Sequence, residues 1–196
     1  MTYTELFLQT TANGLRHWSY ILQHGVQVRT PVNLSVRQVL EEAFAIPHDY
    51  VEDRIQTVFV DGMPVDNIDT AVVHNGARMG LAAALPGAAG IAMRRNSPYA
   101  ALRGDITRKA EVAAQTEDGS ITLLLFNLIM HEQGERFLNR GVESVAWRIA
   151  KLLKEHPEGE KLVIAAPAEA TDMDTLEDWL QKNPEATVRL RVEQSE

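Results

Sequence analysis

The sequence contains no cysteine. This absence excludes disulfide bridges, thiolate-bound zinc or iron–sulfur clusters, and cysteine nucleophiles. Long apolar runs are also missing, since none approaches the roughly 18 residues that span a bilayer. The N-terminal stretch MTYTELFLQTTANG lacks the basic start and apolar core of a signal peptide. These absences predict a soluble, cytoplasmic protein of bacterial type that does not insert into a membrane.

The first 108 residues contain no lysine, and Lys109 is the first one. Residues 1–110 hold ten basic and ten acidic side chains, whereas residues 111–196 hold nine basic and seventeen acidic ones. All of the net charge of −8 therefore lies in the second half. This asymmetry indicates two units. A net acidic chain argues against nucleic-acid binding, which requires basic side chains that neutralise phosphates.

Motifs that carry catalysis or metal binding are absent as well. The sequence HEQGE begins like a zinc-peptidase motif at His131 but has no second histidine, and no pair of histidines has the H-x-H or H-x-x-x-H spacing. Serine-nucleophile motifs and glycine-rich phosphate loops are missing too. The acidic run DMD lacks the glycine and closing glutamate of an EF-hand. We therefore expect no metal, no cofactor and no catalytic residue, which favours a protein that is not an enzyme.

The clearest helix signal lies between Val36 and Phe44, where apolar residues recur with helical spacing. Ser35 and Gln38 have the spacing of a capping box at its start. Asp61-Gly62 predicts a hairpin because both residues tolerate positive φ. Strand signals surround this helix at residues 5–10, 26–28, 55–60 and 78–85. The order strand, strand, helix, strand, strand predicts a mixed sheet with one helix lying across it.

Four short segments carry a family resemblance: SVRQVLEEAF (Ser35–Phe44), VFVDGMPV (Val58–Val65), HNGA (His74–Ala77) and ALPGAAG (Ala84–Gly90). With them, residues 4–90 resemble the ubiquitin-like β-grasp superfamily in its sulfur-carrier branch. That branch includes the small subunit of molybdopterin synthase and the thiamine-pathway sulfur carrier. The resemblance implies a β-grasp fold that presents its sheet face and tail to a partner enzyme.

The chain departs from these carriers at their functional end. The carriers end in a free Gly-Gly whose terminal carboxylate is activated, whereas Gly87 and Gly90 are internal here and are separated by Ala88-Ala89. We therefore expect no carrier chemistry in the intact chain. The alternative is a precursor that is cut after Gly87 or Gly90 to free a usable tail.

Beyond Gly90 the sequence changes character. A basic connecting segment is expected at 93–118, and the polar linker QTEDGS (Gln115–Ser120) overlaps its end. An acidic α/β unit is expected to follow at 119–196, with two helices and then a strand, a helix and a strand. The two strands are expected to be parallel, with a right-handed crossover. The apolar run Ile121–Met130 is consistent with a buried strand or a helix, and helix-compatible residues through Leu138 favour a helix. The other predicted elements are helices at Val142–His156 and Thr171–Lys182, and strands at Leu162–Ala166 and Thr187–Val192. The fold class is thus α+β, with a β-grasp-like domain at 1–92 and this unit behind it.

The segment around the internal glycines is the best candidate for a binding site. Backbone amides near Gly87 and Gly90, together with Arg94, Arg95 and the nearby Arg103, are suited to hold a carboxylate, a phosphate or an acidic partner loop. The alternative is a turn followed by a solvated or internally paired basic segment. If Arg94 and Arg95 form a contact surface, replacing both by alanine should weaken binding and leave the stability nearly unchanged.

Three functions are consistent with these patterns. We expect a non-enzymatic protein-interaction module whose partner is another protein. The second interpretation is the sulfur-carrier precursor described above. The third is an enzyme that binds an anion or small molecule through Arg94 and Arg95.

Overall fold

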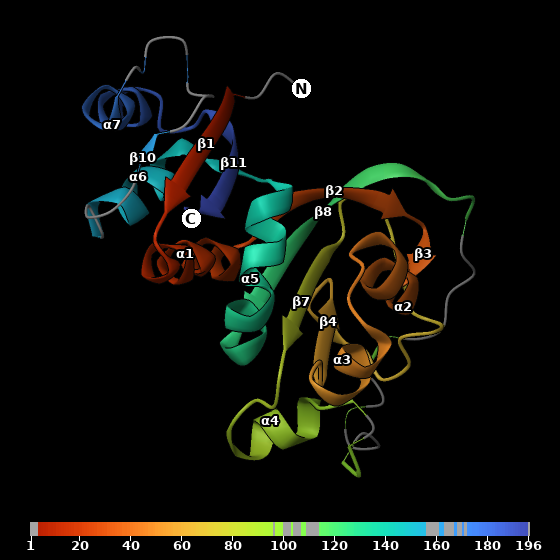
Figure 1. Ribbon diagram of the computed structural model, residues 1–196. Coiled ribbons are helices and arrows are strands. Elements are labelled where there is room, and N and C mark those ends of the chain that lie inside the picture. Colours follow the sequence, from red (N-terminus) through yellow and green to blue (C-terminus); the bar gives the residue numbers. More distant parts are fainter. Residues whose placement is uncertain are drawn as a thin grey trace. The chain divides into compact units, whose positions relative to one another are not determined.

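We describe the protein from a computed structural model, in which residues 4–95, 97–99, 103, 107–108, 114–155, 161–162, 167, 170 and 172–195 are described (Figure 1). The chain forms two compact units. Unit 1 combines Met1–Gln27 with Met130–Glu196, and unit 2 is Val28–Ile129. Unit 1 is therefore built from both ends of the chain. The domain boundaries expected from the sequence, at residues 92 and 118, differ from the boundaries of these two units, and they stay a prediction.

The sheet of unit 1 is built around the first strand of the chain. β1 (Thr4–Thr10) pairs in parallel with β11 (Thr187–Gln194) and antiparallel with β10 (Lys161–Leu162). β9 (Val142–Val145) pairs antiparallel with the other edge of β11. Alternate side chains of a strand point to opposite faces, so every second residue can enter the core. The buried side chains of β1 and β11 follow this alternation: Leu6, Leu8, Val188, Leu190 and Val192.

Helical segments complete unit 1. α1 (Ala12–Trp18) is followed directly by the 3₁₀ helix η1 (Ser19–His24). α5 (Asn127–Arg140) enters from unit 2, and α6 (Ala146–Glu155) and α7 (Met173–Lys182) follow. α6 buries one apolar stripe and leaves its opposite stripe to solvent, as expected of an amphipathic helix. Its buried residues are Ala146, Ile149, Ala150, Leu152 and Leu153.

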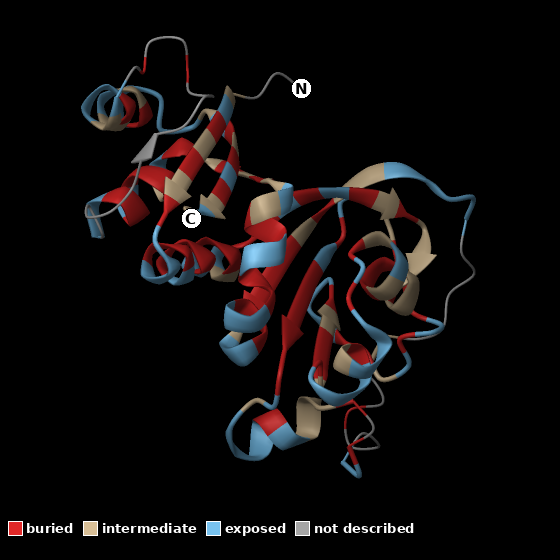
Figure 2. Cartoon of the chain, in the orientation of Figure 1, coloured by how far each residue is buried: buried red, intermediate tan, exposed pale blue. Residues whose placement is uncertain are grey.

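Unit 2 has its own mixed set of strands, hydrogen-bonded in the order β2-β8-β7-β4-β5. The strands are β2 (Val26–Val32), β8 (Glu117–Phe126), β7 (Arg78–Ala82), β4 (Thr57–Val60) and β5 (Met63–Pro64). β7 runs parallel to β8 and antiparallel to β4. Most of β7 is buried (Figure 2). A separate two-stranded sheet pairs β3 (Leu34–Ser35) with β6 (Val72–Val73).

The helix predicted between Val36 and Phe44 is confirmed. It begins as α2 (Val36–Gln38) and continues as a π-helical segment, η2 (Val39–Ala43). The predicted capping box is present, since Ser35 and Gln38 hydrogen-bond each other's backbone amides. Two further helices belong to unit 2, α3 (His48–Asp53) and α4 (Gly87–Met93).

The predicted hairpin is confirmed as well. Asp61 and Gly62 have φ values of +52° and +79°, and they connect β4 with β5. The hairpin is determined locally, because the two turn residues alone reverse the chain.

The predicted architecture, an N-terminal β-grasp domain with one helix, is wrong. An N-terminal β-grasp domain would keep the chain's first strand together with the following strands and a single helix. Instead, β1 pairs with β11, which is the last strand of the chain, and with β10. The last strand of the predicted domain, β7, pairs with β8, which lies beyond that domain. The fold is α+β with mixed strand pairing, and each half of the chain completes the strands of the other.

Some predicted helices are strands in part. Residues 121–126 belong to β8, and α5 begins only at Asn127, which has a φ of +53°. A strand buried on both faces shows a continuous apolar run, which periodicity cannot distinguish from a buried helix. Likewise, residues 142–145 form β9 before α6 begins. The expected strand Leu162–Ala166 lies outside the described residues from position 163 onward.

The expected parallel pair at the end of the chain is also wrong. β1 lies between β10 and β11 and runs parallel to β11 but antiparallel to β10, so β10 and β11 run in opposite directions.

Of the helices that the structure describes, none combines the length and the apolar character that a membrane span requires.

Candidate functional site

The two glycines of the predicted binding segment lie in helix α4. Gly87 begins the helix with a φ of +77°, a conformation that favours glycine. Gly90 is buried, and a Cβ placed on it would lie only 2.2 Å from the carbonyl oxygen of Leu85. Gly90 is therefore explained by close packing of the backbone. The processing alternative would require cleavage at or within this helix, and it stays a prediction.

Arg95 points into unit 2 and away from solvent. Only 9% of the residue is exposed, and its guanidinium donates to the carbonyl oxygens of Ile55 at 3.0 Å and Val51 at 2.8 Å. Burial lowers the pKa of Arg95, and the carboxylate of Glu52 at 3.8 Å partly opposes this effect. This arginine holds the C-terminal end of α3 and the chain beyond it.

Arg103 is also buried and internally paired. It is 5% exposed, and its guanidinium donates to the carboxylate of Asp66 and, at 3.0 Å, to the carbonyl oxygen of Arg94. The side chain of Arg94 itself is half-buried. The structure therefore places the predicted site residues in one region. Two of the three arginines, Arg95 and Arg103, are buried there and form hydrogen bonds within the protein.

A pocket of about 390 Å³ lies in unit 1, and none of those residues lines it. Its volume is within the range of ligand and side-chain pockets. One wall is the exposed stripe of α6, and the other is formed by α1 and η1. The lining residues are His17, Tyr20, Ile21, His24, Trp147, Arg148, Lys151, Leu152 and Glu155.

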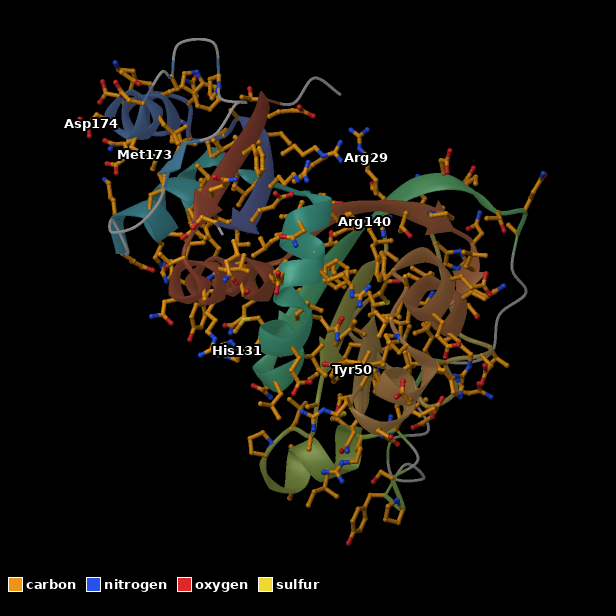
Figure 3. The ribbon with its side chains drawn as sticks, viewed as in Figure 1. Arg29, Tyr50, His131, Arg140, Met173 and Asp174 are labelled. Carbon is orange, nitrogen blue, oxygen red and sulfur yellow. The ribbon has the colours of Figure 1, made fainter. Side chains whose placement is uncertain are left out.

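Aromatic rings surround this pocket. Tyr20 and Trp147 are 43% and 45% exposed, which is unusual for side chains of their size. The ring of Tyr20 lies 6.1 Å from that of His17 and 5.9 Å from that of His131, near the N-terminal end of α5 (Figure 3). His17 is buried, and its Nε2 lies 3.0 Å from the carbonyl oxygen of Leu152. This bond ties α1 to α6 and holds the two walls together.

Positive charge borders the pocket. Arg148 donates to the carbonyl oxygen of Gly25 at 2.8 Å, and its guanidinium carbon lies 5.3 Å from the centroid of the Trp147 ring. Lys151 is 61% exposed at its side chain and lies 3.9 Å from Glu155, which is the acidic residue among the described residues of the lining. The pocket thus combines an aromatic, apolar interior with an excess of basic side chains.

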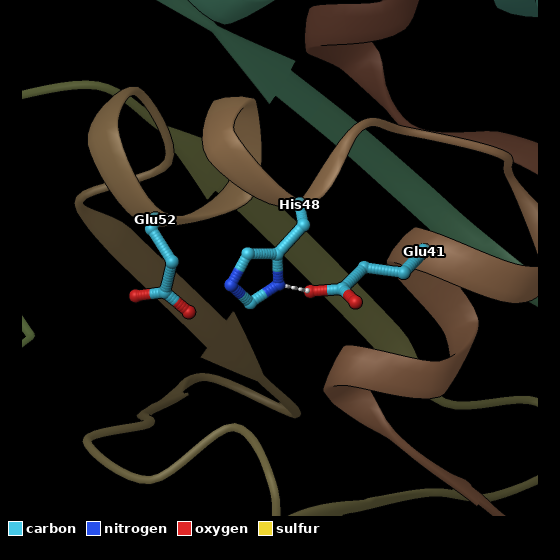
Figure 4. Close-up of side chains that lie close together, drawn as sticks. All are labelled: Glu41, His48 and Glu52. Carbon is cyan, nitrogen blue, oxygen red and sulfur yellow. Dashed lines mark hydrogen bonds and ion pairs between the residues drawn. The ribbon is translucent and has the colours of Figure 1, made fainter.

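A second cluster lies in unit 2, where Glu41, His48 and Glu52 place one ligand atom each within 4.8 Å of one another (Figure 4). The cluster already contains a cation, because Arg37 donates to Glu41 at 2.8 Å and to Glu52 at 2.7 Å, and it also binds Asp69. Burial raises the pKa of Glu41, but the hydrogen bonds from Arg37 and His48 outweigh it and lower that pKa. A metal ion would have to displace the guanidinium, so we interpret the cluster as an arginine-centred ion network.

Comparisons with known protein families, with curated proteins and with solved structures found no match. The resemblance to sulfur carriers therefore stays a prediction from short motifs.

The pocket of unit 1 was not anticipated from the sequence. Its signal was present in α6, where Trp147 and Lys151 are four residues apart on the face opposite the buried stripe. The other wall comes from residues more than 100 positions away, which no local pattern connects to α6.

Proposed function

We propose that the protein is a non-enzymatic binding module that holds an anchor side chain of a partner protein in the pocket of unit 1. The observation that supports this most directly is the pair of half-exposed rings, Tyr20 and Trp147, beside a hollow of about 390 Å³. Tyrosine, tryptophan and arginine are the residues that most often dominate the binding energy of protein interfaces. A rigid ring gains contact area and loses little conformational entropy.

The charges around the pocket indicate the partner's chemistry. Among the described residues of the lining, Arg148 and Lys151 are basic and Glu155 is acidic. Like charges facing each other weaken an interface, whereas complementary charges accelerate association and select the partner. We therefore expect an aromatic or large aliphatic anchor next to an aspartate or glutamate. The enzyme alternative that uses Arg94 and Arg95 is less consistent with the structure, because the guanidinium of Arg95 is buried.

The test starts from a random peptide display library selected on the full-length protein. We expect the enriched peptides to share one aromatic, leucine or methionine residue beside an acidic residue. Binding of a labelled selected peptide, followed by fluorescence polarisation, should weaken at least about tenfold in Trp147→Ala, because the anchor loses its main contact surface. Lys151→Glu should also weaken peptide binding, and the loss of affinity should be larger at low salt than at high salt.

Two matched variants serve as controls. Tyr99→Ala removes an aromatic side chain that is 51% exposed in unit 2, and Lys154→Glu reverses an exposed charge on α6 outside the pocket. Both should bind the peptide like the native protein. Equal binding by Trp147→Ala would overturn the proposal, and so would a small molecule, copurified and seen by native mass spectrometry, that occupies the pocket and excludes the peptide. The cytoplasmic location expected from the sequence stays a prediction.

A further inference from the structure

A second hollow of unit 1 lies on the outer face of its sheet. It measures about 280 Å³. β1 contributes Glu5, Leu6 and Phe7 to its lining, the C-terminal end of α5 contributes Arg140, and β11 contributes Arg189 and Arg191. None of these residues lines the pocket that we propose as the partner site.

Strand register places these side chains together. Glu5 pairs with Arg189, and Phe7 pairs with Arg191, so the four side chains share one face. The opposite face holds the buried leucines and valines, which requires the polar residues to point outward. Arg140 ends α5 (Figure 3). The next residue, Gly141, has a φ of +90°, and a Cβ on it would lie 3.1 Å from Nε of Arg189.

Among the described residues, three guanidinium groups and one carboxylate line this hollow. Next to it, Glu143 of β9 lies opposite Arg189 in the strand register. Arg191 is held in place by the Phe7 ring, whose centroid lies 4.9 Å from its guanidinium carbon, and by Glu193 outside the hollow. Partial burial lowers the pKa of Arg140, and repulsion from the nearby Arg189 lowers it further.

We propose that this hollow binds a phosphate group, either free or as a phosphomonoester of a small molecule. Guanidinium groups are planar forks that bind the oxygens of a phosphate through two parallel hydrogen bonds. A phosphate dianion between Arg189 and Arg191 would also reduce the repulsion between Arg189 and Arg140. The size of the hollow suits a small ligand, and the ring of Phe7 offers an apolar surface beside the charged groups.

The test uses the full-length protein with sodium phosphate and glycerol phosphate as probes, followed by isothermal titration at low ionic strength. Saturable binding with one site per chain is expected for at least one probe. Arg189→Gln and Arg191→Gln should each weaken it about tenfold or more. Arg16→Gln removes the same charge from an exposed position of unit 1 outside the hollow and should leave binding unchanged. Far-UV circular dichroism and urea unfolding establish that each variant is folded.

The probes distinguish the sources of the anion. Tighter binding of glycerol phosphate than of phosphate indicates a phosphomonoester, and the reverse indicates free phosphate. Equal losses in Arg16→Gln and Arg191→Gln would overturn the proposal, because they would show a general charge effect. Saturable binding of acetate, or of a short single-stranded oligonucleotide, with no response to either phosphate probe would overturn it too. None of these outcomes depends on the peptide pocket, so the two proposals can fail separately.

Discussion

At the scale of single residues, Arg94 and Arg95 show how adjacent identical side chains acquire different roles. Arg94 remains half-buried, whereas Arg95 is 9% exposed and donates to two backbone carbonyls. Burying a guanidinium is costly unless its hydrogen bonds are made, and here the carbonyls at the end of α3 supply acceptors. Arg95 is therefore a structural residue, and the expectation that both arginines can be removed without loss of stability needs revision.

We predict that Arg95→Ala lowers the free energy of unfolding by about 2–4 kcal/mol, because two buried carbonyl oxygens lose their donor. Urea unfolding measures this value. Arg94→Ala is the matched control, and it should cost less than about 1 kcal/mol since its side chain is partly solvated. Equal, small losses in both variants would show that Arg95 is not needed for the fold.

At the scale of elements, the segment α2–η2 shows local signals acting together. The capping box at Ser35 starts the helix, and the apolar stripe then turns Val36, Val39, Leu40 and Phe44 inward. Such a stripe stabilises a short helix mainly through tertiary packing, because isolated helices of this length are marginal in water.

The first prediction at this scale concerns Leu40, which is fully buried. Leu40→Ala should lower the free energy of unfolding by about 2–5 kcal/mol, the sum of lost apolar burial and the cavity left behind. Urea unfolding is again the measurement. Glu42→Ala, on the exposed side of η2, should change the stability by no more than about 0.5 kcal/mol. A loss below that limit in Leu40→Ala would mean that the core relaxes to fill the space.

The second prediction at this scale concerns the start of α7, where Asp172 caps the helix. Hydrogen bonds from the Thr175 side chain and backbone hold the pKa of Asp172 below its ordinary value of 3.8. A lowered pKa in the folded state means that the carboxylate contributes stability above pH 3.8 and loses it as the pH falls through the folded-state value.

A carboxyl-carbon NMR titration of Asp172 should therefore show a midpoint below 3.8. Asp172→Asn keeps an acceptor at the cap but cannot titrate, so it should lose less stability than the native protein between pH 5 and pH 2, a range chosen to bracket the titration of aspartate. An NMR midpoint at or above the ordinary value would contradict the role of the cap.

At the scale of the whole molecule, both strand partners of β1 and one of the two partners of β7 lie far along the chain. β1 is paired on both edges by strands from the C-terminal part, and β7 is paired by β8. Contacts of such long sequence separation cost chain entropy before they are formed. We therefore expect β1 to be stable only when the C-terminal strands are present.

We predict that a fragment of residues 1–92 has no cooperative urea transition, whereas the full chain unfolds cooperatively. The fragment retains β1, β4 and β7 but lacks β8, β10 and β11, so unpaired strand edges and apolar side chains are exposed. Unfolding followed by tryptophan fluorescence and circular dichroism checks this, with Trp18 as the reporter in the fragment. A cooperative transition in the fragment would restore an independent N-terminal domain and favour the processing alternative.

The candidate sites were largely beyond the reach of the sequence. Arg94, Arg95 and Arg103 form a basic run that reads as solvated, yet the tertiary structure supplies Val51, Ile55 and other acceptors from distant elements. The pocket of unit 1 joins residues around position 20 with residues around position 150. Neither side of it carries a motif, so only their proximity in the fold makes a site.

What the sequence by itself determined is local. The cap at Ser35, the turn at Asp61-Gly62, the buried stripe that contains Leu40 and the cap at Asp172 depend on residues within about one turn of each other, where φ preferences and short hydrogen bonds decide the conformation. Only the tertiary structure decided which strands pair, because backbone hydrogen bonds between strands are available to any strand in the chain. β1 and β11 pair because this buries the apolar face of each strand in the same core. No short sequence pattern indicates that the two faces will meet.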